Sequence, residues 1–516
     1  MLLPLPTPAE MSVWDRETIH TVGIPGVTLM ESASREAVNV LLEEYGDVDG
    51  AVIHCFAGSG NNGGDAFAMA RALADLGAEV TVFHTRPKKA YRGETRANLL
   101  WAQKLGIRLV HLAGVNLDGL PQPDIVVDGL LGTGFEGALR EDILHMVRTV
   151  NRLGERAFVL AVDIPSGLNG LTGRAQPEAV KADATATFQS PKLGLVMPKA
   201  MEYTGALHVC PIGIPLKVQE DNPVRHHLIT GAVMETLPAP ARDMHKGSAG
   251  HVLVVGGSIG LTGAPHLAAL AALRSGAGLA TVACPAGLAD AVKGGSPDIM
   301  TLPLSSGSAW TRDMAAEARE ELHRFDAVVL GPGLGRAPEA MAFALDLIAS
   351  CELPMVLDAD ALFALAANPE HLKTLPERAV LTPHPGEMAR LLDVSIADIQ
   401  ADRLGAAERF LAACDATLVL KGAGTLVADP DTTCVSPFAE PNLSVGGSGD
   451  VLSGVVGTLL AGGLTPLHAA CAGVFWHGLA GRALNNEFPA RGNLASEIAN
   501  MLPHAAASFT KELETC

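Results

Sequence analysis

The segment at residues 446–457, GGSGDVLSGVVG, places glycines and a carboxylate at the start of an apolar stretch typical of a helix. Gly446, Gly447 and Gly449 leave backbone N–H groups unobstructed, and such groups at a helix start form an anion hole for a transferring phosphoryl group. Asp450 comes next, where it could accept a proton from an attacking hydroxyl. The alternative is that Asp450 only caps the helix, and the two roles are compatible.

Two other segments of the second half bring polar groups to the ends of apolar runs. KGAGT at residues 421–425 follows a strand-like run and could hold a nucleotide phosphate, with a solvated Lys421 as the alternative. His384 lies in TPHPGE, where two prolines restrict the loop. We expect His384 to face a ligand, with a structural histidine as the alternative. No G-x-x-x-x-G-K-S/T motif is present, which excludes a P-loop kinase.

In the first half, GSGNNGGD at residues 58–65 lies between a strand-like run and a helical pattern. It formally satisfies G-x-G-x-x-G, the fingerprint of a dinucleotide site. The acidic residue expected after the next strand is absent, because His84 and Thr85 stand there. We therefore disfavour an ordinary NAD redox site, and a simple tight turn is the other alternative. Asparagine and aspartate oxygens suit a hard cation or a polar ring.

More polar residues follow the later strands of the first half. Asp128 follows the third strand, Asp163 the fourth, and residues 189–192, ending in Lys192, the fifth. Because the carboxyl ends of parallel strands meet at one edge of a sheet, we expect these loops to converge on one crevice.

Short apolar runs alternate with helical patterns in both halves, which predicts two doubly wound α/β domains with parallel sheets. The expected strands are residues 51–56, 79–83, 124–127, 158–162 and 184–188, then 251–255, 327–330, 355–357, 379–381 and 417–420. Helical patterns at 66–76 and 141–153 separate strands of the first half, and residues 429–432 are expected to turn a hairpin at a mixed sheet edge. Residues 215–244 carry charges and a Pro-Ala-Pro unit without a strong strand signal, so we divide the chain into domains 1–220 and 221–516.

The composition bounds the kind of protein. Of the 516 residues, 48% are hydrophobic, which argues against a disordered chain. The net charge of −19 disfavours binding to nucleic acid and to anionic membranes. The eight cysteines are scattered, so a zinc site or a disulfide framework is not expected. The N-terminus lacks the basic region of a signal peptide and no apolar stretch is uninterrupted enough to span a membrane. We expect a cytoplasmic protein.

Together these motifs resemble a known family. Residues 22–33, 58–65, 128–134, 162–173 and 188–195 resemble the NAD(P)H-hydrate epimerase domain, which has a Rossmann-like fold. Residues 245–264, LGPGLG, LDADAL, LTPHPGE, KGAGT and GGSGDVLSG are similar to the ribokinase-like NAD(P)H-hydrate dehydratase. The resemblance implies a bifunctional enzyme. One domain would interconvert the R and S hydrates of NADH and NADPH, and the other would dehydrate the S hydrate with ADP, releasing AMP and phosphate.

The resemblance also implies roles for individual residues. Hydrate-binding residues of the epimerase would be Asn61, Asn62, Gly63, Gly64, Asp65, Gly132, Thr133, Gly134, Phe135, Glu136, Gly137, Ala138 and Asp163. Potassium would be bound by Asn62, Asp128 and Ser166, and acid/base groups would be Asp163 and Lys192. In the dehydratase, hydrate contacts would be Ala264, Gly333, His384 and the catalytic Asp450, and nucleotide contacts Lys421, Gly422, Ala423, Gly424, Thr425 and Gly449. Magnesium would accompany ADP, and a homo-oligomer is expected.

One departure from the family pattern bears on the first domain. Ala66 stands where the family commonly has glycine after NNGGD, so its methyl group is expected to crowd the substrate. A first domain that binds a ligand or a protein without catalysis is therefore one alternative. The other is a ribokinase-like vitamin or sugar kinase fused to a non-catalytic ligand-binding domain.

Overall fold

The computed structural model describes residues 2–135, 137–237, 243–488 and 491–515, with side chains up to residue 509. The chain forms two compact units, Leu3–His227 and the residues from Leu228 onward together with the first two. The division lies inside the segment 215–244. That each unit folds independently stays a prediction.

The N-terminal unit is built on a parallel sheet in the order β4-β3-β2-β5-β6-β7-β8. Its strands are β2 (Val52–Ala57), β3 (Glu79–His84), β4 (Arg108–His111), β5 (Ile125–Gly129), β6 (Phe158–Val162), β7 (Ala184–Phe188) and β8 (Ala206–Cys210). The central strands are almost entirely buried, as expected for a sheet covered on both faces.

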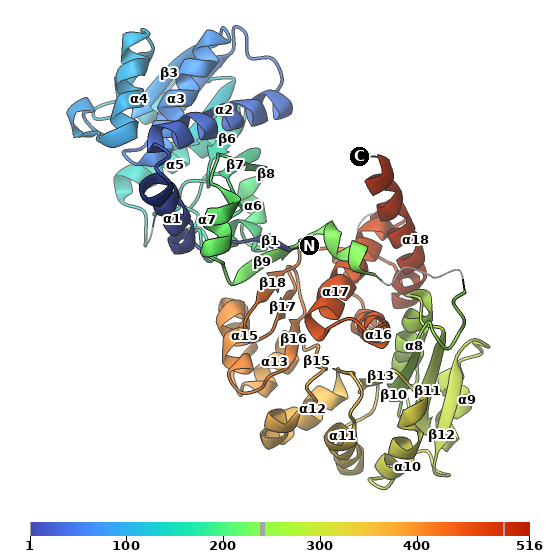
Figure 1. Cartoon of the computed structure of the whole chain (residues 1–516). Coiled ribbons are helices and arrows are strands. Elements are labelled where there is room, and N and C mark those ends of the chain that lie inside the picture. Colours follow the sequence, from blue (N-terminus) through green and yellow to red (C-terminus); the bar gives the residue numbers. More distant parts are fainter. Residues whose placement is uncertain (1, 136, 238–242, 489–490, 516) are drawn as a thin grey trace. The chain divides into compact units, whose positions relative to one another are not determined.

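Helices cover both faces of this sheet (Figure 1). Helices α2, α3 and α4 pack together on one face, and α5 packs on the other. The helical segments are α1 (Pro8–Arg16), η1 (Glu17–Val22), α2 (Gly26–Glu44), α3 (Asn61–Asp75), η2 (Lys88–Ala90), α4 (Gly93–Lys104), η3 (Leu117–Gly119), α5 (Glu141–Gly154), η4 (Leu193–Val196), α6 (Met201–Thr204) and α7 (Leu216–Asp221).

The sheet of the C-terminal unit runs β18-β17-β16-β15-β14-β13-β10-β11-β12. The strands are β10 (His251–Val255), β11 (Leu279–Pro285), β12 (Met300–Leu304), β13 (Ala327–Leu330), β14 (Met355–Leu357), β15 (Ala379–Leu381), β16 (Thr417–Leu420), β17 (Leu426–Ala428) and β18 (Thr433–Val435). Neighbours pair in parallel except for β16-β17-β18, which are antiparallel. The predicted hairpin and mixed edge are therefore confirmed.

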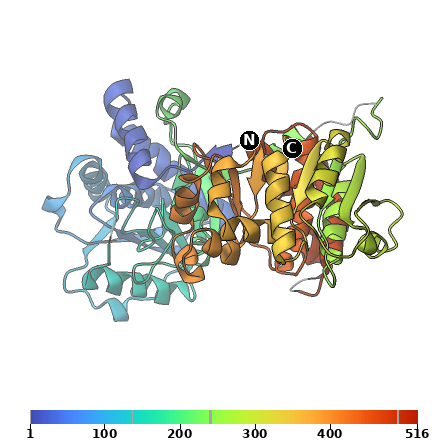
Figure 2. The same cartoon turned by 90° about the horizontal axis from the view of Figure 1, so that it is seen from below.

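Two layers of helices enclose this sheet. Helices α8, α16, α17 and α18 form a layer on one face. Helices α10, α11, α12 and α13 lie on the other face, and each contacts the next. Figure 2 shows helices of the second layer, in yellow and orange, in front of the strands. The helices are α8 (Gly263–Arg274), α9 (Ala289–Lys293), α10 (Met314–Glu321), α11 (Pro338–Ser350), α12 (Asp360–Ala367), α13 (Pro385–Leu391), α14 (Ile396–Ala401), α15 (Arg403–Leu411), α16 (Ser448–Ala461), α17 (Pro466–Ala483) and α18 (Ala495–Thr515). Short 3₁₀ segments are η5 (Gly231–Thr236), η6 (Ala286–Leu288), η7 (Leu322–Arg324), η8 (Pro369–Thr374), η9 (Pro441–Leu443) and η10 (Leu484–Asn486).

The fold class predicted from the sequence is confirmed, because both units are α/β with helices on both faces of a largely parallel sheet. Three local expectations need correction. Strands β4, β8, β11 and β12 were not predicted, and the segment 215–244 contains α7 and the strand β9 (His226–Ile229). A further short strand is β1 (Leu2–Pro4). Helix α3 begins at Asn61 rather than at residue 66, so NNGGD forms its first turn and not a loop.

Candidate active sites

In the C-terminal unit, the glycine-rich segment turns into α16. The helix N-cap is Gly447, whose φ of 94° lies in the left-handed region, and no side chain caps the helix. A Cβ at Gly447 would lie 2.7 Å from Leu267 and 3.0 Å from Ala495, so both the conformation and the space require glycine. Asp450 is in the first turn of α16. The capping alternative for Asp450 is therefore wrong.

Lys421 is held by carboxylates and is not a solvated lysine. Its Nζ donates to Asp358 Oδ1 at 2.8 Å and lies 3.8 Å from Glu387 Oε2. The second Asp358 oxygen accepts a 2.6 Å hydrogen bond from Ser453 Oγ on α16. Burial opposes the charge of Lys421, but the carboxylates of Asp358 and Glu387 outweigh it and raise the Lys421 pKa. Lys421 therefore stays cationic beside the start of α16.

Two carboxyl groups near Lys421 titrate close to neutrality. Burial, reinforced by the charge of Asp358 and opposed by Lys421, raises the pKa of Asp450 to about 7. Burial also raises the pKa of Glu387 to about 7, again against the attraction of Lys421. A group with such a pKa can take up or release a proton at neutral pH, which is the property of a general base.

These groups line a cavity of about 660 Å³. Among the predicted site residues, the cavity brings together His384, Lys421, Gly422, Ala423, Thr425, Gly449 and Asp450. Ala264, Gly333 and Gly424 are not among the residues that line it. Ala264 and Gly333 are neighbours, because a Cβ at Gly333 would lie 3.3 Å from the Ala264 methyl.

His384 has a structural role in addition to lining the cavity. It is the N-cap of α13, and its Nδ1 accepts hydrogen bonds from the N–H groups of Gly386 and Glu387, at 2.9 and 3.3 Å. Glu387 closes the capping box by accepting from the His384 N–H at 2.8 Å. The ligand-facing and structural interpretations of His384 therefore both fit the geometry.

His477 and Arg403 are among the residues of this site to which the sequence analysis assigned no role. His477 on α17 lines the cavity, its Nε2 lies 3.2 Å from Ser448 Oγ, and burial lowers its pKa to about 4. Arg403 donates to the carbonyl oxygens of Leu420 and Lys421, at 2.8 and 3.3 Å, and to that of Ala423. Arg403 therefore fixes the backbone of residues 421–425, the predicted nucleotide-binding loop, which we call the nucleotide loop. Neither residue lies in a motif that announces such a role.

In the N-terminal unit, the first turn of α3 lies against the end of β2. A Cβ at Gly63 would come within 1.9 Å of the Gly58 carbonyl oxygen, so only glycine allows this approach. Asn62 and Asp65 are buried on the helix, with exposures of 6% and 5%. The methyl group of Ala66 is fully buried and faces Gly129 of β5, where an added Cβ would lie 2.8 Å away. The Ala66 methyl therefore packs against the backbone of β5, and its effect on the substrate stays a prediction.

The three predicted potassium ligands lie together. Ser166 Oγ donates to Asp128 Oδ1 at 2.6 Å, and the Ser166 N–H donates to Asp128 Oδ2 at 2.8 Å. Asn62 Nδ2 lies 2.8 Å from the Leu131 carbonyl oxygen and 2.6 Å from that of Val162. A carboxylate and a hydroxyl are therefore in direct contact, and the Asn62 amide nitrogen lies against two backbone carbonyl oxygens of the neighbouring strand ends. Oxygen atoms of these kinds suit a hard cation.

Asp163 and Lys192 form a buried ion pair at the ends of β6 and β7. Lys192 Nζ contacts Asp163 Oδ1, and it also donates to Thr187 Oγ1 at 3.1 Å and to the Phe188 carbonyl at 3.0 Å. The side chains are only 1% and 9% exposed. Asp163 has a φ of 65°, and backbone strain of this kind gathers at functional sites.

The loop after β5 borders the same region. A Cβ at Gly132 would lie 2.5 Å from Asn62 Oδ1, so this loop passes directly over the first turn of α3. Of the predicted hydrate-binding residues, Glu136 lies outside the described residues.

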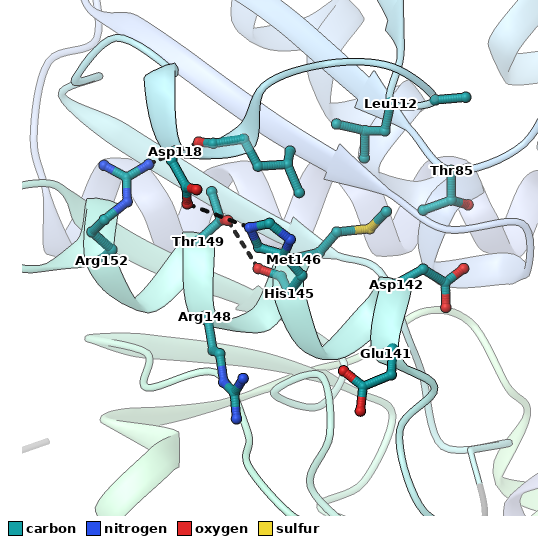
Figure 3. Close-up of a pocket in the computed structure, with 12 residues that line it drawn as sticks. Thr85, Leu112, Asp118, Glu141, Asp142, His145, Met146, Arg148, Thr149 and Arg152 are labelled. Carbon is teal, nitrogen blue, oxygen red and sulfur yellow. Dashed lines mark hydrogen bonds and ion pairs between the residues drawn. The ribbon is translucent and has the colours of Figure 1, made fainter.

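The N-terminal unit contains a cavity of about 780 Å³, which lies away from these residues (Figure 3). It is bordered by one side of α5, by η3 and by the residues after β3 and β4, and none of the predicted site residues lines it. In Figure 3 the imidazole of His145 points toward Asp118, 3.4 Å away, and Arg152 donates to the Leu117 carbonyl at 2.9 Å. His145 and Arg152 therefore pair within the lining of the cavity, whereas Arg148 forms an ion pair with Glu178, which does not line it.

Within the described ranges, no group of three or more His, Cys, Asp and Glu side chains could hold a metal ion. No helix in the described part of the chain is both long and apolar enough to cross a bilayer.

The fold and the sites define a two-unit α/β enzyme, one unit having a glycine-rich helix start and an acidic, lysine-containing cavity. Residues 252–504 match the family model described as NAD(P)H-hydrate dehydratase, and residues 26–194 match the one described as YjeF-related protein N-terminus. The chain belongs to the family of bifunctional NAD(P)H-hydrate repair enzymes.

Full-length relatives carry this assignment. The bifunctional NAD(P)H-hydrate repair enzyme of Moorella thermoacetica is 40% identical over 99% of this chain and 98% of its own. That of Coxiella burnetii is 37% identical over 93% and 94%. The ADP/ATP-dependent NAD(P)H-hydrate dehydratase of Bacillus subtilis, co-crystallised with ATP and Mg²⁺, is 30% identical, with a TM-score of 0.47 over 54% of this chain and 96% of that one. The two full-length relatives favour the repair enzyme and not the kinase.

Proposed function

We propose that this chain repairs hydrated NADH and NADPH through two activities. The N-terminal unit interconverts the R and S hydrates, and the C-terminal unit dehydrates the S hydrate with ADP, releasing AMP and phosphate. Family membership supports both activities. The observation that carries the proposal at residue level is Asp450, which lines the cavity at the start of α16 with a pKa raised by burial to about 7.

In the dehydratase, Asp450 accepts the proton of the ring hydroxyl as that oxygen attacks the β-phosphorus of ADP. The new P–O bond forms as the bond to AMP breaks, and N–H groups at the start of α16 stabilise the charge on the transferring phosphoryl group. The phosphate ester is a better leaving group than hydroxide. The ring nitrogen lone pair then expels phosphate, and loss of a proton from the neighbouring carbon restores the double bond of NAD(P)H.

The nucleotide would lie along the Lys421–Thr425 loop, whose backbone is pinned by Arg403. Lys421 remains cationic beside the phosphates because Asp358 and Glu387 hold its charge. Magnesium, which binds nucleotides through phosphates and one or two carboxylates, would be held by Glu387, whose side chain lines the cavity. When bound, the ion neutralises phosphate charge.

In the epimerase, potassium would be held by Asn62, Asp128 and Ser166. The proposal is supported by the direct contact of Ser166 with Asp128 and by the hydrogen bond from Asn62 to the Leu131 carbonyl oxygen. When bound, the ion would neutralise the buried carboxylate of Asp128 beside the loop that follows β5. Asp163 and Lys192 are the acid/base groups that face the hydrate. Cytoplasmic localisation and assembly into a homo-oligomer remain part of the proposal, and sedimentation of the purified chain tests the second.

The test is to incubate the purified chain with separated R and S hydrates, with and without ADP, and to measure NADH, AMP and phosphate. We expect the S hydrate to yield the three products in equal amounts, and only with ADP. The R hydrate should yield NADH faster than its non-enzymatic epimerisation permits. A stable phosphorylated product would contradict the dehydratase, and an R-hydrate rate equal to the non-enzymatic rate would contradict the epimerase.

A further inference from the structure

Two arginines of the C-terminal unit lie against one aromatic ring, that of Phe363 on α12. The guanidinium carbon of Arg336 lies 4.7 Å from the ring centroid, and that of Arg390 lies 5.9 Å from it. Arg336 belongs to the loop that follows β13, and Arg390 belongs to the last turn of α13. Two separate segments therefore bring positive charge to one place, and we call these two residues the arginine pair.

The loop that carries Arg336 is fixed by hydrogen bonds. Asp360, the first residue of α12, accepts from Arg336 Nε at 2.9 Å through one oxygen and from the Gly335 N–H at 2.9 Å through the other. The loop is also closely packed, because a Cβ at Gly333 would lie 2.3 Å from the Leu261 carbonyl oxygen. Arg336 is therefore positioned before a ligand arrives, which lowers the entropic cost of binding.

Most of the hydrogen-bond donors of the arginine pair are available to a ligand. Within the described part of the chain, Arg336 donates only through Nε, and the guanidinium group of Arg390 has neither a hydrogen bond nor an ion pair. Both residues are exposed. The planar guanidinium group matches the paired oxygens of a phosphate, so the arginine pair is suited to a ligand that carries phosphate groups.

The arginine pair borders the predicted hydrate contacts of the dehydratase. Arg336 is three residues beyond Gly333, and Arg390 is on α13, whose N-cap is His384. The His384 side chain is 53% exposed. Burial lowers the pKa of His384, and the charges of Arg390 and Arg336 act in the same direction. Neither arginine lines the cavity of about 660 Å³, so the arginine pair lies beside that cavity and not within it.

The charge of the cavity explains why a second cationic site is needed. The acidic residues that line it are Asp358, Glu387, Glu440 and Asp450, and Lys421 is the one lysine or arginine among the described residues of the lining. In the proposed function Lys421 serves the phosphates of ADP. The hydrate brings a diphosphate and, in the NADPH form, a further 2′-phosphate. A second polyanion in this acidic cavity would be repelled.

We infer that the arginine pair binds the phosphate groups of the hydrate, outside the cavity that holds ADP and the reacting ring. The inference rests on the proposed dehydratase function and assigns part of its substrate to residues without a predicted role. The guanidinium groups donate hydrogen bonds to phosphate oxygens, and the face of Phe363 attracts both cations and so holds them together. The arginine pair takes no part in bond breaking, so its effect is on the affinity for the hydrate.

Arg336→Met and Arg390→Met, singly and together in the full chain, test the inference. The exposed Arg319→Met on α10 is the matched control. Loss of charged hydrogen bonds should raise KM for the S hydrate roughly tenfold to a hundredfold in the double variant. KM for ADP and kcat should change by no more than a few-fold, and Arg319→Met should leave all three constants unchanged.

Two comparisons identify the phosphate group that is bound. An equal rise in KM for the hydrates of NADH and NADPH indicates the diphosphate, whereas a rise for the NADPH hydrate alone indicates the 2′-phosphate. Added salt should raise the KM of the parent for the hydrate by screening the attraction. The KM of the double variant should depend less on salt, a difference that a merely structural role would not produce.

The outcomes separate this inference from the proposed function. If the parent does not convert the S hydrate with ADP, the proposed function itself fails. If the parent is active and the folded double variant keeps KM for both hydrates within a few-fold of the parent, the inference is wrong. An equally large rise in KM for ADP would also overturn it, because the arginines would then serve the nucleotide. If Arg336→Met unfolds, the exposed Arg390→Met decides, and an unchanged KM for both hydrates overturns the inference.

Discussion

Both units place a lysine against an aspartate where buried strands end, but the two ion pairs have different surroundings. In the N-terminal unit, Lys192 is 1% and Asp163 9% exposed, and the pair is enclosed by further carboxyl groups. In the C-terminal unit, Lys421 is 17% exposed and the pair borders a cavity beside the N–H groups of α16. An isomerisation needs only proton transfer, whereas phosphoryl transfer must also accept an anion. The backbone donors and the cavity are what distinguish the second site.

The largest effect is expected from Asp450→Asn, which keeps the size of the side chain but removes the base. Dehydratase activity should fall by roughly 10²–10⁴, while ADP binding survives because its N–H donors belong to the backbone. Epimerisation should be unchanged. The measurement is NADH formation from the S hydrate with ADP, with the exposed Asp415→Asn as control. If the folded Asp450→Asn protein forms NADH at a rate within a few-fold of the parent, Asp450 is not the general base.

Arg403→Met tests whether the nucleotide loop depends on its anchor. The substitution keeps an apolar stem and removes hydrogen bonds to three carbonyl oxygens. Such charged hydrogen bonds contribute about 1.5–3 kcal/mol, so KM for ADP should rise roughly tenfold to a hundredfold, with a smaller change in kcat. Arg409→Met, at an exposed position of the same helix, is the control. An unchanged KM for ADP together with a loss of thermal stability would make Arg403 purely structural.

Dehydratase activity should fall as the pH drops through the pKa of its base. Asp450 must be ionised to act as a base, and its pKa is raised by burial to about 7. Dehydratase activity should therefore fall about tenfold per unit as the pH drops below 7. The measurement is the rate of NADH formation from the S hydrate with ADP on both sides of pH 7. A rate that does not change with pH would contradict the role of Asp450 as the base.

A smaller, several-fold effect is expected from Asp128→Asn on the potassium dependence of the epimerase. Burial raises the Asp128 pKa to about 6, against its hydrogen bonds from Ser166, so at neutral pH the carboxylate is ionised and suited to a cation. The Asn side chain keeps the shape but not the charge. Epimerase rates should be measured across a potassium titration at constant ionic strength. Identical titration curves for variant and parent would show that Asp128 is not a cation ligand. The dehydratase activity should be unchanged by the substitution.

The sequence by itself determined the fold class and most central strands. β6, β7, β10 and β13 to β16 have the predicted bounds, because a short apolar run between turn signals is a local feature. Strands such as β4 (RLVH) and β8 (ALHVC) were missed because their partial burial interrupts the apolar pattern. The start of α3 was missed because two glycines oppose a helix locally, and only the close approach to Gly58 explains them.

The tertiary structure alone decided how the site residues work together. Asp358 meets Lys421 and Ser453 across 63 and 95 positions of the chain, and no local pattern encodes such contacts. The same holds for Arg403, whose carbonyl partners belong to another element. Motifs specify residue types at one strand end. Burial and the charge of distant partners set their pKa values, and these depend on the folded chain as a whole.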